Sequence, residues 1–153
     1  MGREPMADRT RASIEIGAPA DAVMAVIADL RAYPEWTGEV KRAEILETDP
    51  DSGRASRAVL TIDGGALRDR QELSYTFEGD GAVRWSLIKG DMLRSLEGAY
   101  TLTPGADGAS TTVEYTLAVD TKIPLLGMMK SKMEKVVIDR ALAGLKKRVE
   151  SLR

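Results

Sequence analysis

The most informative part of the sequence is its C-terminal end, residues 124–152, which read PLLGMMKSKMEKVVIDRALAGLKKRVESL. Apolar residues recur there at steps of three and four, which is the period of one face of an α-helix. These residues are Leu126, Met129, Met133, Val137, Ala141, Leu145, Val149 and Leu152. The pattern predicts one amphipathic helix from Pro124 to about Leu152, roughly 40 Å long at 1.5 Å per residue, with one face against a core.

The region before this helix has the pattern of a sheet. Apolar and polar residues alternate in short runs that end in Gly, Pro and Asp clusters, which is typical of antiparallel strands with one covered face. The expected strands are residues 10–16, 40–47, 56–62, 67–78, 82–88, 93–103 and 110–120. The sequence therefore predicts an antiparallel sheet of six to seven strands that curls around the C-terminal helix.

The covered face of this sheet is expected to be bulky, with one gap. Its side chains are Leu73, Tyr75, Phe77, Val83, Trp85, Leu87, Leu96, Gly98, Tyr100, Leu102, Val113, Tyr115, Leu117 and Val119. Gly98 leaves room among large neighbours. One helix also cannot cover the whole concave face, so we expect empty space near one end of it.

A helix is expected between the first two strands. Pro19 suits the first helical position, and Asp21 places a negative charge in the first turn. The predicted helix runs over residues 19–32, and residues 34–38 form a turn or a second short helix. Residues 1–9 are expected to be a flexible leader, and residues 10–153 a single domain.

The composition narrows the classes of function. The 153 residues contain no Cys and no His, so thiolate chemistry and any His-dependent triad are excluded. The net charge of −2 gives no electrostatic footprint for nucleic acid. No apolar run approaches the length of a membrane span, and the N-terminus does not resemble a secretory signal. We expect a cytoplasmic protein with no cofactor and no metal site.

Four segments resemble one family. They are IEIGAPADAV (residues 14–23), ADLRAYPEW (28–36), VRWSL (83–87) and LEGAYTL (96–102). With the order of the expected elements, they make the chain similar to the START-like (SRPBCC) superfamily, in its polyketide cyclase/dehydrase and coenzyme Q-binding-type branch known from actinobacteria. The resemblance implies an α+β helix-grip fold with a cavity for lipids, sterols, isoprenoid quinones or polyketides. It supplies no invariant catalytic motif.

Nine side chains are candidates for the lining of such a cavity. They are Trp36, Tyr75, Trp85, Met92, Tyr100, Tyr115, Met128, Met129 and Met133. Aromatic residues with a polar tip can orient a ligand carbonyl or hydroxyl, and methionine adapts to irregular apolar shapes. Each residue could equally be ordinary core, and Trp36 could be either a packing corner or a gate.

The other candidate sites are weak. The glycines of Asp63-Gly64-Gly65 precede no helix, so a phosphate-binding loop is excluded. Arg68, Asp69 and Arg70 are expected to form surface ion pairs, with Arg70 on a ligand carboxylate as the alternative. The alternation places no carboxylate in the interior, so we expect no catalytic residue.

Three functions remain open. The first is binding or transport of an apolar small molecule by a monomer or weak homodimer. The second is a polyketide cyclase, aromatase or dehydratase in which Tyr75, Tyr100 or Tyr115 donates a proton and an arginine polarises a carbonyl. The third is a protein-interaction module of the same superfamily, with which the basic segment Lys146-Lys147-Arg148 is compatible.

Overall fold

The computed structural model describes residues 9–64 and 68–153. Most of the expected leader (residues 1–8) and the expected first residue of the fourth strand, Leu67, lie outside the described residues. The elements are β1 (Thr10–Ile16), α2 (Ala20–Ala28), the 3-10 helix η1 (Leu30–Ala32), α3 (Tyr33–Trp36), β2 (Val40–Thr48), β3 (Ala55–Asp63), β4 (Arg68–Glu78), β5 (Ala82–Gly90), β6 (Leu93–Pro104), β7 (Thr111–Thr121) and α4 (Gly127–Ser151).

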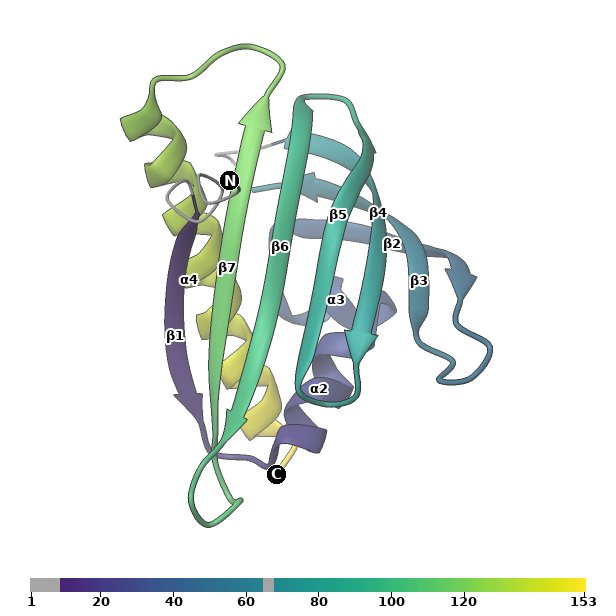
Figure 1. Ribbon diagram of the computed structural model, residues 1–153, viewed down its shortest axis with the longest axis vertical. Helices are drawn as coiled ribbons and strands as arrows, with labels where there is room; N and C mark the ends of the chain where they lie inside the picture. Colours follow the sequence, from purple (N-terminus) through teal and green to yellow (C-terminus); the bar gives the residue numbers. More distant parts are fainter. Residues whose placement is uncertain (1–8, 65–67) are drawn as a thin grey trace, which may run out of the picture.

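The seven strands form one antiparallel sheet in the order β1-β7-β6-β5-β4-β3-β2. The sheet is not closed, because β1 and β2 are its two edges. Figure 1 shows it curling so that α4 lies along the concave side behind β1 and β7, while α2 and α3 lie behind β4 and β5. The α+β helix-grip architecture expected from the sequence is confirmed, with each strand within one or two residues of its predicted bounds.

Helix α4 buries only part of the predicted stripe, Leu145 and Val149, together with residues beside it. Ile138, Leu142, Leu145 and Val149 are buried in the core. By contrast, Leu126, Met129 and Leu152 of the predicted stripe are exposed. The stripe prediction holds for the middle of the helix, where Met133, Val137 and Ala141 pack partly against the core and line a cavity, and fails at its two ends.

The helix after β1 is shorter than predicted. It breaks at Asp29, whose backbone (φ −88°, ψ 77°) is not helical, so that α2 and η1 replace the single helix expected over residues 19–32. The break lets Leu30 enter a small apolar cluster with Ala55 and Ala58. It also sets the direction of α3, which carries Trp36 to the concave side of the sheet.

Polar contacts fix the C-terminal end of α4. Glu150 accepts hydrogen bonds from the backbone N–H of Gly17 (2.9 Å) and from Lys146 Nζ (2.8 Å). These bonds, that of Lys146 first, lower the pKa of Glu150. Arg148 forms an ion pair with Glu35 at 2.9 Å. This end of the helix is therefore held against the β1–α2 turn and α3.

Candidate functional site

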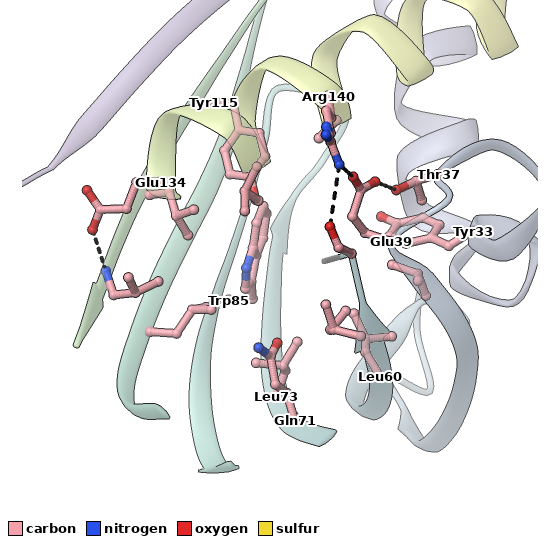
Figure 2. A pocket seen from close by; sticks show the side chains of 18 of the residues that line it. Tyr33, Thr37, Glu39, Leu60, Gln71, Leu73, Trp85, Tyr115, Glu134 and Arg140 are labelled. Atoms are coloured by element: carbon pink, nitrogen blue, oxygen red, sulfur yellow. Dashed lines mark hydrogen bonds and ion pairs between the residues drawn. The ribbon is translucent and has the colours of Figure 1, made fainter. Parts of the chain in front are cut away.

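A cavity of about 130 Å³ lies between α4 and the concave face of the sheet. Six of the nine side chains expected in its lining are there: Trp36, Tyr75, Trp85, Tyr100, Tyr115 and Met133. Figure 2 shows Arg140, Glu39 and Thr37 on one side of it, Glu134 on the opposite side, and Gln71 and Leu73 at its floor. The sheet, α3 and α4 thus each contribute to one enclosed space.

Three of the expected lining residues are elsewhere. Met92, Met128 and Met129 do not line the cavity, and their exposed fractions are 46%, 84% and 54%. Met128 and Met129 occupy the first turn of α4, and Met92 lies in the β5–β6 turn. The sequence shows that these methionines are apolar, but not which turns of the chain the sheet leaves uncovered.

The sheet side of the cavity is a wall of aromatic rings. Trp85 lies 5.4 Å from Tyr100 and 5.6 Å from Tyr115 between ring centroids, and these two tyrosines are 4.7 Å apart. Tilted and edge-on pairs at such distances are favourable beyond their buried area. The register explains the cluster, because Tyr100 and Tyr115 are directly opposed on β6 and β7.

Gly98 has a role opposite to the one expected. It is directly opposed to Trp85 across β5 and β6. A Cβ atom at Gly98 would lie 2.4 Å from the Trp85 ring, so the indole occupies the space that the glycine leaves. Gly98 therefore lets Trp85 lie against the sheet and does not itself open the cavity.

The tyrosine hydroxyls are neutral donors. Burial, followed by the neighbouring tyrosines, raises the pKa of Tyr100 and of Tyr75, and burial alone raises that of Tyr115. Among the described residues, none hydrogen-bonds to these three hydroxyls. Tyr33 differs, because its hydroxyl donates to the carbonyl of Ile27 at 2.5 Å. The wall can thus offer several O–H groups to a guest molecule.

Trp36 adds a further donor. Its ring packs edge-on against Tyr33 at 5.0 Å between centroids. The indole Nε1 is buried and has no hydrogen-bond partner among the described residues. A buried N–H without an acceptor costs free energy, so this group destabilises the corner unless a partner reaches it. The residue thus packs at a corner, as one interpretation expected, and also lines the cavity.

Glu134 is the lining residue that sequence analysis missed. Although charged, it is only 1% exposed. One carboxylate oxygen accepts from the Thr10 hydroxyl (2.6 Å) and the other from the backbone N–H of Val119 (2.8 Å). Val119 lies on β7 beyond the last residue that pairs with β1, so its N–H lacks a partner in that strand. Glu134 therefore ties α4 to both strands.

Asp69 is buried as well, contrary to the surface ion pair expected for it. Its carboxylate accepts from the backbone N–H groups of Asp91 (2.9 Å) and Met92 (2.8 Å), which fixes the β5–β6 turn. It also accepts from Nε2 of Gln71 at 3.3 Å, which orients this amide at the cavity floor. By strand parity Asp69 shares the inward face of Leu73, but its charge argued for the outside. Arg68 pairs with Asp63 at the surface, as expected.

One side of the cavity is closed by polar contacts between three segments. Arg140 of α4 donates to Glu39, before β2, at 2.8 Å and to the carbonyl of Gly64, after β3, at 3.5 Å. Thr37 donates to the other oxygen of Glu39 at 3.4 Å. The Arg140 side chain is half exposed, so this ion pair lies where the cavity meets solvent. The alternative of Arg70 on a ligand carboxylate fails, since Arg70 is exposed and does not line the cavity.

Metal sites and membrane spans leave recognisable geometric signatures. Over residues 9–64 and 68–153, no group of three or more acidic side chains has the geometry to hold a metal ion. Within the same ranges, no helix is long and apolar enough to cross a membrane.

The family follows from a match along the sequence. A family model described as "Polyketide cyclase / dehydrase and lipid transport" matches residues 16–146. The chain belongs to this family. The match covers most of the sequence and includes β2 to β7, α2, α3 and most of α4. Among curated proteins, no sequence matches the chain.

Solved structures of this fold are similar over nearly the whole chain. A START superfamily protein from Mycobacterium smegmatis is 25% identical, with a TM-score of 0.88 over 95% of this chain and 99% of that one. A protein from Thermus thermophilus is 20% identical, with a TM-score of 0.76 over 94% and 98%. The Zhui aromatase/cyclase from a Streptomyces species is 16% identical, with a TM-score of 0.75 over 93% of each chain. The START-like fold inferred from the sequence segments is confirmed.

Proposed function

We propose that this member of the family binds and carries an uncharged, hydrophobic small molecule in the cavity under α4. The lipids, isoprenoid quinones and polyketide-like compounds named in the sequence analysis all fit this description. The observation that carries the proposal is the character of the walls: they are mostly apolar, yet they hold three tyrosine hydroxyls and one indole N–H without a partner in the described protein. We expect it to act in the cytoplasm as a monomer or weak homodimer.

The donors define the polar part of the ligand. Because Tyr75, Tyr100 and Tyr115 stay protonated and Trp36 can only donate, the guest must supply acceptors, such as carbonyl, ether or hydroxyl oxygens. An ionised group inside the cavity would find no free counter-charge, because both oxygens of Glu134 are engaged and Arg140 is paired with Glu39. Burying such a charge unpaired is costly. The proposed ligand is therefore neutral.

The volume defines the part of the ligand that is held. The cavity is about as large as an engineered apolar cavity of about 150 Å³ that binds benzene. A single ring or short branched segment fits this space. A longer ligand must project past the Arg140–Glu39 ion pair, where solvent can hydrate its remainder.

The residues favour a carrier over a catalyst. The sequence contains no histidine and no cysteine, and the buried carboxylates of Glu134 and Asp69 are occupied by backbone and side-chain donors. The raised tyrosine pKa values keep these phenols from acting as bases near neutral pH. We therefore identify no lining residue that is placed to act as a base and remove a proton from a ligand.

A polyketide cyclase or aromatase is the second candidate, favoured by one observation. The hydroxyl-bearing rings of Tyr100 and Tyr115 lie 4.7 Å apart between centroids, with Trp85 against both. Two neutral phenols so close could donate to a carbonyl of a folded chain and stabilise its enol. Arg140 could polarise a second carbonyl near the solvent side.

Native mass spectrometry distinguishes the carrier from the cyclase. The protein is purified from its own organism, and any bound molecule is extracted and its mass compared before and after incubation with protein. The carrier proposal predicts a reproducible, uncharged apolar molecule that returns unchanged. Loss of water or ring closure in that molecule would establish the second candidate. A protein that stays empty when offered lipids, quinones and polyketides would overturn both.

A further inference from the structure

Large apolar side chains are exposed at one end of the molecule. Ile123, Leu126 and Met128 have exposed fractions of 68%, 74% and 84%. Six of the nine large apolar side chains that the described residues expose lie in the segment from β7 into α4 or beside it. We call this set the apical patch; it consists of Met92, Ile123, Leu125, Leu126, Met128 and Met129.

The patch is joined by contacts between two turns. The backbone N–H of Lys122 donates to the carbonyl of Met92 at 2.9 Å, and Lys122 Nζ donates to the carbonyl of Gly90 at 2.8 Å. The β5–β6 turn therefore lies against the β7–α4 connection. Figure 1 shows both at the same end of the sheet, beyond the ends of the strands. Met92 therefore lies beside Lys122, at the end of the sheet from which the chain continues to Leu126 and Met128.

The segment from the end of β7 into α4 is basic, unlike the chain as a whole. The chain is slightly acidic, with a net charge of −2. Between Asp120 and Glu134 the sequence has three lysines, Lys122, Lys130 and Lys132, and no acidic residue. Within the described ranges, no ion pair involves Lys130 or Lys132, whereas Lys135, Arg140, Lys146 and Arg148 of the same helix are all paired. Asp91 in the β5–β6 turn is an acidic residue at the edge of the patch.

We propose that the apical patch docks on the surface of an anionic phospholipid bilayer. Apolar tips flanked by unpaired lysines are the composition that inserts into the boundary between headgroups and acyl chains, with electrostatic attraction to acidic lipids. A protein partner fits less well, because the patch lacks the tryptophan, tyrosine and arginine anchors that dominate protein interfaces. The lysines match the negative charge of the lipid surface.

Docking would bring the cavity close to the membrane. Met133 follows Met129 by about one helical turn and already lines the cavity. Seating the apical patch therefore places the cavity roughly 10 Å from the headgroups at 1.5 Å per residue of α4. That a ligand passes between cavity and membrane rests on the proposed function; docking itself does not.

Vesicle flotation of the full chain, stripped of any bound molecule, tests the proposal. Vesicles of phosphatidylcholine alone are compared with an equimolar mixture of phosphatidylcholine and phosphatidylglycerol, at low and high salt. We expect binding to the anionic vesicles that weakens with salt. Replacing Leu126 and Met128 together by glutamine lowers the partition coefficient by about tenfold or more, and each of Lys130→Gln and Lys132→Gln lowers it by about fivefold.

Matched controls lie at the other end of the same helix. Leu152 is 64% exposed, and Lys147 is exposed without an ion pair among the described residues. Leu152→Gln and Lys147→Gln are expected to leave the partition coefficient unchanged. The proposal is overturned if the unaltered chain does not float with anionic vesicles, or if patch and control variants bind equally. It is also overturned if sedimentation shows that the patch variants abolish a dimer, which would assign the patch to a second copy of the chain.

Discussion

At its C-terminal end helix α4 buries Leu145 and Val149 and is fixed by the contacts of Glu150, whereas at its N-terminal end it exposes Met128 and Met129. The same amphipathic helix is thus a core element over one half and a partly uncovered element over the other. Glu134, near the boundary, is the inward anchor of the N-terminal half. The difference indicates that the stability of the fold depends more on the C-terminal half of the helix than on its first turn.

The largest expected effect is on the packed half. Leu145→Ala removes a fully buried side chain and is expected to lower the free energy of unfolding by about 2–5 kcal/mol. Leu126→Ala, at the exposed end, is expected to change it by less than about 0.5 kcal/mol. Urea denaturation followed by circular dichroism measures both. Similar values for the two variants would contradict the difference between the halves.

The two glutamates of α4 provide the second comparison. Glu134→Ala leaves the Val119 N–H without its acceptor in the interior and is expected to cost about 1–3 kcal/mol. Glu150→Ala removes an exposed carboxylate that water can replace, so a much smaller change is expected. Thermal unfolding of both variants checks this. If Glu150→Ala lowers the unfolding temperature more than Glu134→Ala does, Glu134 is not the anchor of the N-terminal half of α4.

Glycine substitutions compare the cavity wall with the free helix end. Gly98→Ala forces the Trp85 ring away from the sheet and is expected to cost about 1–3 kcal/mol, with a change in the near-ultraviolet dichroism of the indole. Gly127→Ala meets no atom within 4 Å and is expected to be neutral or slightly stabilising. An unchanged near-ultraviolet spectrum in Gly98→Ala would show that Trp85 does not depend on this glycine.

The tyrosines predict a pH dependence that appears only in alkali. Tyr100 and Tyr115 are buried and Tyr33 and Tyr75 are half-buried, and in each case burial raises the pKa above the ordinary value of 10. Above pH 10 the unfolded chain loses these protons while the folded chain keeps them, so stability falls as pH rises and is unaffected by these groups below that pH. Absorbance at alkaline pH should show no tyrosinate until the protein unfolds. Ionisation near pH 10 in the folded state would contradict the buried wall.

The strands were predictable because a half-buried strand shows its alternation directly in the sequence. Tyr75, Trp85, Tyr100 and Tyr115 were expected on the covered face, and the structure places all four in the cavity wall. The register that opposes Tyr100 to Tyr115 could not be read from the sequence, since it depends on pairing between strands.

The misses share a physical cause. Asp69 was expected at the surface because it is charged, and Glu134 was given no role, yet each is satisfied by backbone N–H groups that only the folded chain supplies. Met92, Met128 and Met129 were expected inside because they are apolar, but the fold leaves all three exposed. The alternation along β4 was the one signal in the sequence that Asp69 is buried, because Asp69 lies four residues before Leu73 and so shares its face of the strand.

The most direct test of the proposed binding site uses the tryptophans. The sequence has two, Trp36 and Trp85, and both line the cavity. Their indole N–H signals in a nitrogen-15 correlation spectrum are therefore reporters of occupancy on two different elements. The probe is duroquinone, an uncharged single-ring quinone that presents two acceptor oxygens. We predict that both indole signals shift and saturate together as the quinone is added, while Leu126→Gln protein responds in the same way. Unmoved indole signals, or shifts confined to the outer face of the sheet, would contradict binding in the cavity.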